Sequence, residues 1–292
     1  MNRVTVANVA ALGMALILSA LWAYEGRAAP SATEHAARTE YRRIVSASTV
    51  ADRLLLELCA REDIVAVTGQ SAEGSFAARF VGFETIDSLD RLERIVALSP
   101  DLVLTHNVGD PRRVARLEEA GLTVVDLGTL DGRASLFEDI RQVAALCGAE
   151  AEGAVYARRL RRRLDAVALG LPYDERLGAL YVSVYADRFY GGARGTSYRD
   201  ILEAAGLRDV SGERTGWPQY GAEELLQIDP PRIVTREGGR HALCDHAVLR
   251  RLSACPDGVL ELPGDLLDSP GPGMLDAAEA LHDLAYPAAE IP

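Results

Sequence analysis

Short apolar runs alternate with longer amphipathic stretches along most of the chain. Runs such as 64–68 and 102–105 are almost continuously apolar, which is typical of strands buried on both faces. Stretches such as 49–61 and 134–147 repeat apolar residues at three- and four-residue steps, which predicts helices. Because strands and helices alternate, the pattern predicts an α/β fold with parallel sheets covered on both faces.

Two regions show neither pattern and are predicted to be loops. They are residues 69–86 and residues 185–196, and the second is rich in aromatic residues and glycine. Parallel sheets bind ligands at the carboxyl ends of their strands, where such loops begin. These loops are therefore the first place to look for binding residues.

The longest amphipathic stretch runs from 150 to 169. Its apolar side chains recur at helical spacing and arginines fill the positions between them, which predicts one long helix with a single buried stripe. Gly170 and Pro172 should end it, because glycine accepts a left-handed cap and proline cannot continue the hydrogen-bond ladder.

A repeated unit lies on each side of this helix. The segment Glu93–Thr105 aligns without a gap with Glu223–Thr235. Each copy predicts a short helix that begins at a glutamate, breaks before a proline, and leads into a buried strand. The repeat predicts two similar lobes, 43–149 and 171–288, joined by a rigid backbone helix at 150–170.

The first thirty residues predict export. Val4–Ala23 is almost wholly apolar, and Gly26 and Ala28 fit a signal-peptidase site, so residues 1–29 are predicted to be a signal peptide, followed by a linker at 30–42. The apolar segment is also long enough to remain in the membrane as an uncleaved anchor. Either alternative places the rest of the chain in the periplasm or another extracytoplasmic space.

Export changes the interpretation of the four cysteines, because an oxidising compartment favours disulfides. Cys244 and Cys255 flank a short predicted helical run at 246–252 and are expected to pair. Cys59 and Cys147 each lie near the end of a predicted first-lobe helix. For that second pair, a disulfide and two buried free thiols both remain open.

Composition and motifs exclude several classes of function. The net charge of −12 argues against nucleic acid, which selects for a basic face. Common hydrolase, metalloprotease and nucleotide-binding motifs are absent from the sequence. The spacing of His241, Cys244 and His246 resembles a transition-metal site, but a Cys244–Cys255 bridge explains the cysteine more simply. We therefore expect no catalytic residues, no metal site and no cofactor belonging to the protein itself.

The order of these elements resembles the cobalamin- and iron-siderophore-binding proteins of ABC importers. The resemblance covers about Arg43 to Pro287 and is strongest in 92–104 and in Trp217-Pro218-Gln219 with Glu223. It implies two Rossmann-like lobes with parallel sheets, joined by one backbone helix, that hold a metal chelate in the cleft between them. The protein would act as a monomer and deliver a cobalt- or iron-containing ligand to a membrane permease.

The resemblance also implies roles for particular residues. Glu93 and Glu223 match glutamates that dock onto arginines of the permease. Trp217 matches a tryptophan of the cobalamin-binding members, whereas His106 replaces an aromatic residue. The sequence leaves cobalamin, haem and ferric siderophore open as the ligand.

Candidate ligand contacts come mainly from the loops. Aromatic side chains there suit a large flat ligand, His106 could contact the ligand or its metal, and arginines could pair with carboxylates. The residues expected to contact ligand are Ser48, Gln70, Phe83, His106, Tyr185, Phe189, Tyr190, Trp217 and Arg236. Tyr220, Arg79, Arg188 and Arg194 are further candidates.

Two other classes of function remain open. A membrane-anchored sensor or scaffold on the same fold would keep the cleft without transport. A metal-cofactor enzyme on this scaffold would need ligands from both lobes, whereas Cys59 and Cys147 both belong to the first.

Overall fold

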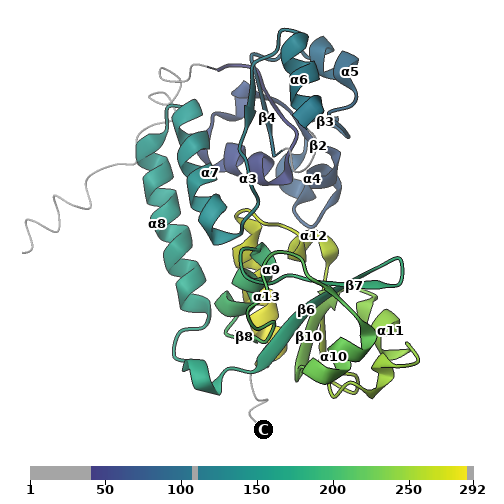
Figure 1. Ribbon diagram of the computed structural model, residues 1–292. Helices are drawn as coiled ribbons and strands as arrows, with labels where there is room; N and C mark the ends of the chain where they lie inside the picture. The colour runs from purple at the N-terminus through teal and green to yellow at the C-terminus, as the bar shows by residue number, and fades with distance from the viewer. Residues whose placement is uncertain (1–40, 107–110, 288–292) are drawn as a thin grey trace, which may run out of the picture. The chain divides into compact units, whose positions relative to one another are not determined.

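The computed structural model describes residues 41–106 and 111–287 (Figure 1). The predicted signal peptide or anchor at 1–29 and most of the predicted linker lie outside these residues. Within the described part of the chain, no helix is long and apolar enough to cross a membrane.

The first lobe is built on five parallel strands in the order β3-β2-β1-β4-β5. The strands are β1 (Ile44–Ser46), β2 (Ile64–Thr68), β3 (Glu84–Ile86), β4 (Leu102–Thr105) and β5 (Val124–Asp126). The α-helices are α3 (Thr49–Leu58), α4 (Gly69–Glu73), α5 (Leu92–Ala97), α6 (Pro111–Glu119) and α7 (Arg133–Leu146), with 3₁₀ turns η1 (Arg61–Asp63) and η2 (Ala77–Phe80).

Helices cover both faces of this first sheet. Alternate residues of β4 belong to different cores: Val103 packs with Ile95 of α5, whereas Leu104 packs in the cluster that contains Leu54 of α3 and Leu136 of α7. The prediction of a parallel sheet covered on both faces is confirmed. The prediction that 69–86 is a loop is wrong, because the segment contains α4 and β3. Thr68 caps α4 by accepting a hydrogen bond from the Ser71 amide (3.2 Å).

The second lobe has a mixed sheet in the order β11-β10-β6-β7-β9, with β8 beside β6. Its strands are β6 (Gly178–Tyr185), β7 (Arg188–Gly191), β8 (Arg208–Asp209), β9 (Gln219–Tyr220), β10 (Arg232–Arg236) and β11 (Val259–Leu262). Its helices are α9 (Ser197–Ala204), α10 (Ala222–Ile228), α11 (Gly239–Cys244), α12 (Gly264–Leu267) and α13 (Gly273–Ala285), with 3₁₀ turns η3 (Tyr173–Glu175) and η4 (Leu249–Arg251).

The expectation that this second sheet is parallel throughout is wrong. β7 and β9 are antiparallel additions; β7 lies inside the predicted loop at 185–196, and β9 pairs with it from residues 219–220. Ala186 and Asp187 both have positive φ (48° and 58°), as a two-residue hairpin turn between β6 and β7 requires. This turn lacks the usual glycine, so the hairpin carries no clear sequence signal.

The long helix α8 (Glu150–Val167) contacts helices of both lobes. It packs closely on α7 at Gly153, where a Cβ atom would lie only 2.4 Å from the Cβ of Ala144. Leu160 and Leu164 form its buried stripe, whereas the predicted member Val155 is exposed. The predicted backbone helix is therefore present and ends two residues before the predicted Leu169.

One hydrophobic cluster extends from the first lobe into the second. It contains Leu54 and Leu136 from the first lobe, Leu160 from α8, and Val234 and Met274 from the second. The side chain of Arg53 on α3 adds an ion pair to Asp276 on α13 (2.6 Å). The lobes thus share a core as well as a connecting helix.

The repeated unit adopts the same local structure in both lobes, as α5–β4 and α10–β10. Ser99 and Asp229, which are equivalent in the repeat and precede its prolines, both have left-handed φ (48° and 38°). Each turn is held by a side chain: Arg43 donates to the Ser99 carbonyl (2.9 Å), and Ser253 donates through its hydroxyl to the Asp229 carboxylate (2.7 Å).

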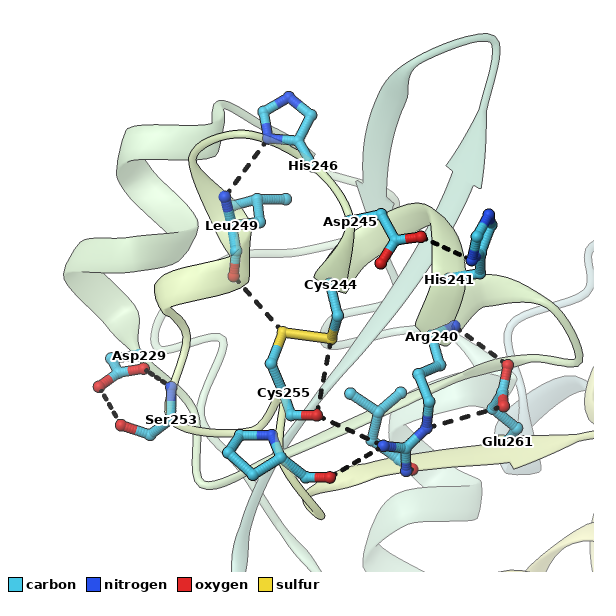
Figure 2. The surroundings of a disulfide bond; sticks show 12 residues. Asp229, Arg240, His241, Cys244, Asp245, His246, Leu249, Ser253, Cys255 and Glu261 are labelled. Carbon is cyan, nitrogen blue, oxygen red and sulfur yellow. Dashed lines mark hydrogen bonds and ion pairs between the residues drawn. A yellow bond between two sulfur atoms is a disulfide. The ribbon is translucent and has the colours of Figure 1, made fainter.

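All four cysteines are paired. Cys244 and Cys255 form the predicted disulfide, and Arg240 supports the same corner by donating to the carbonyl oxygens of Cys255 (3.4 Å) and Pro256 (3.2 Å) (Figure 2). The bridge starts at the last residue of α11, and the predicted helical run at 246–252 contains only η4. Cys59 and Cys147 form a second disulfide, which decides the alternative left open above.

Candidate functional site

A cavity of about 400 Å³ lies at the carboxyl edge of the first sheet. Each strand of that sheet leads to a residue that lines the cavity. Thr68 and Ile86 are the last residues of β2 and β3, whereas Ser48, His106 and Leu130 follow β1, β4 and β5. The opposite wall comes from the second lobe and consists of Ser197, Tyr198, Trp217, Asp268 and Pro270. The cavity therefore lies between the lobes, where a parallel sheet is expected to bind ligand.

Ser48, His106 and Asp139 form a buried chain of hydrogen bonds in the cavity wall. The Ser48 Oγ atom lies 2.7 Å from His106 Nδ1, and His106 Nε2 lies 3.3 Å from Asp139 Oδ2. The side chains of His106 and Asp139 are each only 2 % exposed. Burial raises the pKa of the Asp139 carboxyl, outweighing the hydrogen bond from His106.

The partners of Ser48 give this chain a direction. Its Oγ accepts the Ala51 amide proton (3.4 Å) as the N-cap of α3. An ionised Asp139 can only accept from His106 Nε2, and in the tautomer that satisfies it the Ser48 hydroxyl donates to His106 Nδ1. In that tautomer Ser48 turns its remaining lone pair, and not its proton, toward the cavity.

His106 has no free ring nitrogen in this arrangement, because both nitrogens are engaged in hydrogen bonds. The hypothesis that His106 ligates the ligand's metal would require one of these two bonds to break. The geometry instead makes His106 a support for Ser48.

A second cavity of about 340 Å³ adjoins the first, because Tyr198 and Trp217 line both. Tyr185, Tyr190 and Arg236 line its other walls. Trp217 is 55 % exposed and Tyr185 is 74 % exposed, so both rings can contact a large ligand. Together the two cavities provide a long, aromatic-edged groove.

Asp268 organises the polar part of this groove. Its carboxylate accepts from the Tyr198 hydroxyl (2.9 Å) and forms an ion pair with Arg236 (2.7 Å). The Tyr198 ring stacks on Tyr181 with centroids 3.9 Å apart. Burial raises the pKa of Asp268, and it also raises the pKa of Tyr198, which therefore remains a neutral donor.

The charges that line the groove do not favour an anion. The first cavity has two carboxylates, Asp87 and Asp268, and no arginine, and the one arginine of the second cavity is paired with Asp268. Among the lining residues that the structure describes, no arginine is left to pair with a carboxylate of a ligand.

Residues 44–254 match the protein family described as periplasmic binding protein. The chain belongs to this family. A relative from Bacillus subtilis, an uncharacterized ABC transporter substrate-binding lipoprotein, is 22 % identical over 231 residues, covering 76 % of this chain and 73 % of that protein. A cobalamin-binding protein of Halobacterium salinarum is 28 % identical over 204 residues, covering 68 % of this chain but only 54 % of that protein.

Solved structures show the same fold. A periplasmic heme-binding protein from Pseudomonas aeruginosa superposes with a TM-score of 0.70 at 24 % identity, covering 86 % of this chain and 94 % of that chain. The two α/β lobes are therefore the fold of periplasmic binding proteins, a family of solute-binding proteins.

Several expected ligand residues of this periplasmic binding protein lie elsewhere. Phe189 and Tyr220 are buried in the second-lobe core, because they occupy β7 and β9 rather than a loop. Phe83 packs against the main core and under the guanidinium of Arg61. Arg79, Arg188 and Arg194 line neither cavity of the groove.

The two proposed docking glutamates, Glu93 and Glu223, are exposed in the first turns of α5 and α10. Neither carboxylate has an ion-pair partner among the described residues. The adjacent Glu224, in contrast, pairs with Arg214 (2.5 Å) and accepts from the Gly221 amide (3.3 Å).

The possible metal motif around Cys244 offers no site. Its sulfur is in the disulfide, and His241 pairs with Asp245 (2.7 Å). Across residues 41–106 and 111–287, no group of three or more His, Cys, Asp or Glu side chains could hold a metal ion.

Sequence reasoning missed Asp139, Tyr198 and Asp268. Asp139 lies inside α7 and Tyr198 inside α9, where their spacing is that of ordinary helix residues. Asp268 follows α12 in the turn that leads to Pro270, where the sequence carries no recognisable binding motif.

Proposed function

We propose that this protein is the extracytoplasmic binding component of an ABC importer, and that it carries an uncharged, amide-bearing metal chelate of the cobalamin type between its lobes. The single observation that carries the ligand class is the lining of the groove, where the one arginine is already paired with Asp268. A carboxylate buried there would lack a cationic partner, which is costly.

The hydrogen-bond polarity of Ser48 points to the same ligand class. When His106 donates to Asp139 and accepts from Ser48, Ser48 offers a lone pair to the cavity and suits a donor such as an amide N–H. Corrinoids carry such amides around a flat ring, whereas haem carries carboxylates at its edge. The exposed rings of Trp217 and Tyr185 supply apolar area for the flat part of the ligand.

Names of relatives support this proposal without deciding it. The Halobacterium relative is named for cobalamin and the Pseudomonas structure for heme. The charge of the groove favours the first of these chemistries. The predicted apolar N-terminus supports export, and the exposed Glu93 and Glu223, which have no ion-pair partner among the described residues, support delivery to a permease.

Calorimetric titration with cyanocobalamin, cobinamide, haemin and a ferric hydroxamate siderophore tests the proposal. We expect the two corrinoids to bind at least roughly tenfold more tightly than the other ligands. Trp217→Ala should weaken corrinoid binding by about tenfold or more, because a large ring is lost from a partly desolvated groove.

Tyr173→Ala is the matched control, because Tyr173 is an equally exposed aromatic residue (58 %) that lines neither cavity. Tighter binding of haemin or of the siderophore would refute the ligand class. Failure of all four ligands to bind would remove the importer function itself.

A further inference from the structure

A separate cavity of about 150 Å³ lies outside the proposed ligand groove, where α3, α8 and the start of α13 meet. Arg53, Arg79, Arg159 and Arg163 line it together with Tyr156 and Asp276. None of these side chains lines either cavity of the groove. The volume is about five times the ~30 Å³ that one water molecule occupies in the liquid.

Positive charge exceeds negative charge in this cavity. Two of the arginines are matched by carboxylates of the lining, Arg53 by Asp276 (2.6 Å) and Arg79 by Glu57 (2.6 Å). Arg163 pairs with Glu279 (2.7 Å), which is not part of the lining. Arg159 has no ion-pair partner anywhere in the described ranges.

Arg53 supplies buried donors that lack acceptors. Its side chain is only 10 % exposed, and its guanidinium lies 4.0 Å from the centre of the Phe76 ring. One amino group reaches Asp276, but Nε and Nη1 have no hydrogen-bond partner among the described residues. Buried N–H groups of a charged side chain are costly when they are left unpaired.

Tyr156 adds another donor. Burial, followed by the nearby Glu57, raises the pKa of Tyr156 to about 12, so its hydroxyl keeps its proton at any physiological pH. Among the lining residues, Arg53 thus has unpaired N–H groups and Tyr156 keeps a hydroxyl proton to donate, and the surplus charge is positive. A ligand that only accepts hydrogen bonds and carries negative charge is the chemical complement.

We propose that this cavity binds a small oxyanion, either a tetrahedral phosphate or sulfate or the carboxylate of a small metabolite. Guanidinium groups pair with both kinds of oxyanion through parallel N–H···O bonds. The bound anion would contact α3 of the first lobe, the connecting helix α8 and α13 of the second lobe at once. It would therefore fasten the junction between the lobes.

Calorimetric titration of the full chain with inorganic phosphate, sulfate and succinate, at constant ionic strength set with chloride, tests this proposal. We expect saturable binding of one anion per chain by at least one of the three probes. Preference for phosphate or sulfate identifies a tetrahedral ligand, and preference for succinate identifies a carboxylate.

Two exposed arginines of α8 form a matched pair of variants. Arg159→Ala should weaken the binding by roughly tenfold, as expected when a charge-assisted contact is lost. Arg162→Ala should bind normally, because Arg162 lies on the same helix but does not line the cavity. General salting-out by phosphate or sulfate would affect both variants equally.

Absence of saturable binding by all three probes, or equal binding by the two variants, would overturn the proposal. Neither result would affect the importer function, because corrinoid binding in the groove is measured separately.

Discussion

The Oγ atom of Ser48 lies 2.7 Å from Nδ1 of His106, across the boundary between β1 and β4. At this boundary the strand order of the first sheet reverses, since β2 and β3 extend to one side of β1 and β5 lies beyond β4. The carboxyl ends of neighbouring strands part at such a switch point and leave a crevice. The hydrogen bond therefore closes the floor of the ligand cavity.

Asp139→Asn should reverse the direction of the hydrogen bond between Ser48 and His106. The amide of asparagine can donate to His106 Nε2, which moves the imidazole proton to Nδ1 and turns the Ser48 proton toward the cavity. We expect cyanocobalamin binding to weaken about tenfold, or ~1.4 kcal/mol, with the fold retained. Calorimetry measures the affinity, and ¹⁵N NMR of the histidine ring reports the tautomer.

Asp131→Asn is the control for this change, since Asp131 is exposed and outside the cavity lining. A switched tautomer with unchanged affinity would show that Ser48 does not contact the ligand.

Removal of both proposed docking charges should separate transport from binding. In the double variant Glu93→Ala with Glu223→Ala, corrinoid affinity should be unchanged, because both carboxylates are exposed on α5 and α10 and line neither cavity. Uptake and stimulation of the cognate ATPase should fall sharply and lose salt dependence. Glu119→Ala with Glu175→Ala removes two other exposed charges and should transport normally. Normal transport by the first double variant would refute the docking role.

The two disulfides should differ in their effect on stability. They close loops of different length, with sequence separations of 88 for Cys59–Cys147 and 11 for Cys244–Cys255. The chain-entropy model predicts a loss of roughly 4–5 kcal/mol for replacement of the first pair by alanine and roughly 2–3 kcal/mol for the second. Urea unfolding of both double variants measures this order. A smaller effect of the longer loop would contradict the entropic explanation.

Asp52 should make the protein less stable as pH rises. It is fully buried, and burial raises the pKa of its carboxyl despite hydrogen bonds from Ser46, Thr68 and Ser71. A raised folded-state pKa means that the native protein binds the proton more tightly than the unfolded chain. Its contribution to stability is therefore greatest below the unfolded pKa of 3.8 and is lost as pH rises through the folded value.

Comparison with Asp52→Asn isolates this contribution. The stability of the wild-type protein relative to the variant should fall between pH 4 and pH 7 when both are unfolded with urea at each pH. A relative stability that is constant or increases with pH would show that hydrogen bonds, and not burial, dominate at Asp52.

The regular elements of the fold were predictable because their signals are local. The apolar runs at 64–68 and 102–105 predicted β2 and β4 to the residue. The strands β7 and β9 were not predictable, since they are short, carry polar residues such as Arg188 and Gln219, and depend on pairing with each other. Tertiary contacts, and not local propensity, decide such strands.

The candidate site was predictable to the extent that its residues follow strands. Ser48 and His106 line the cavity because β1 and β4 end just before them, and Trp217 belongs to a loop that faces it. Asp139 could not be found in this way, since it lies 33 residues beyond His106 on a helix and becomes a partner only when α7 packs on the sheet. Phe189 was misplaced for the opposite reason, because its supposed loop is a strand that turns the ring into the core.

The hydrophobic cluster that runs from Leu54 through Leu160 to Met274 has a consequence for signalling. A core shared by both lobes resists hinge motion, so the spacing between Glu93 and Glu223 should be nearly the same with and without ligand. A permease that binds those two carboxylates would then find the same spacing in the ligand-bound and the ligand-free protein. It would have to sense occupancy from the ligand itself, or from rim side chains such as Trp217 that the ligand touches.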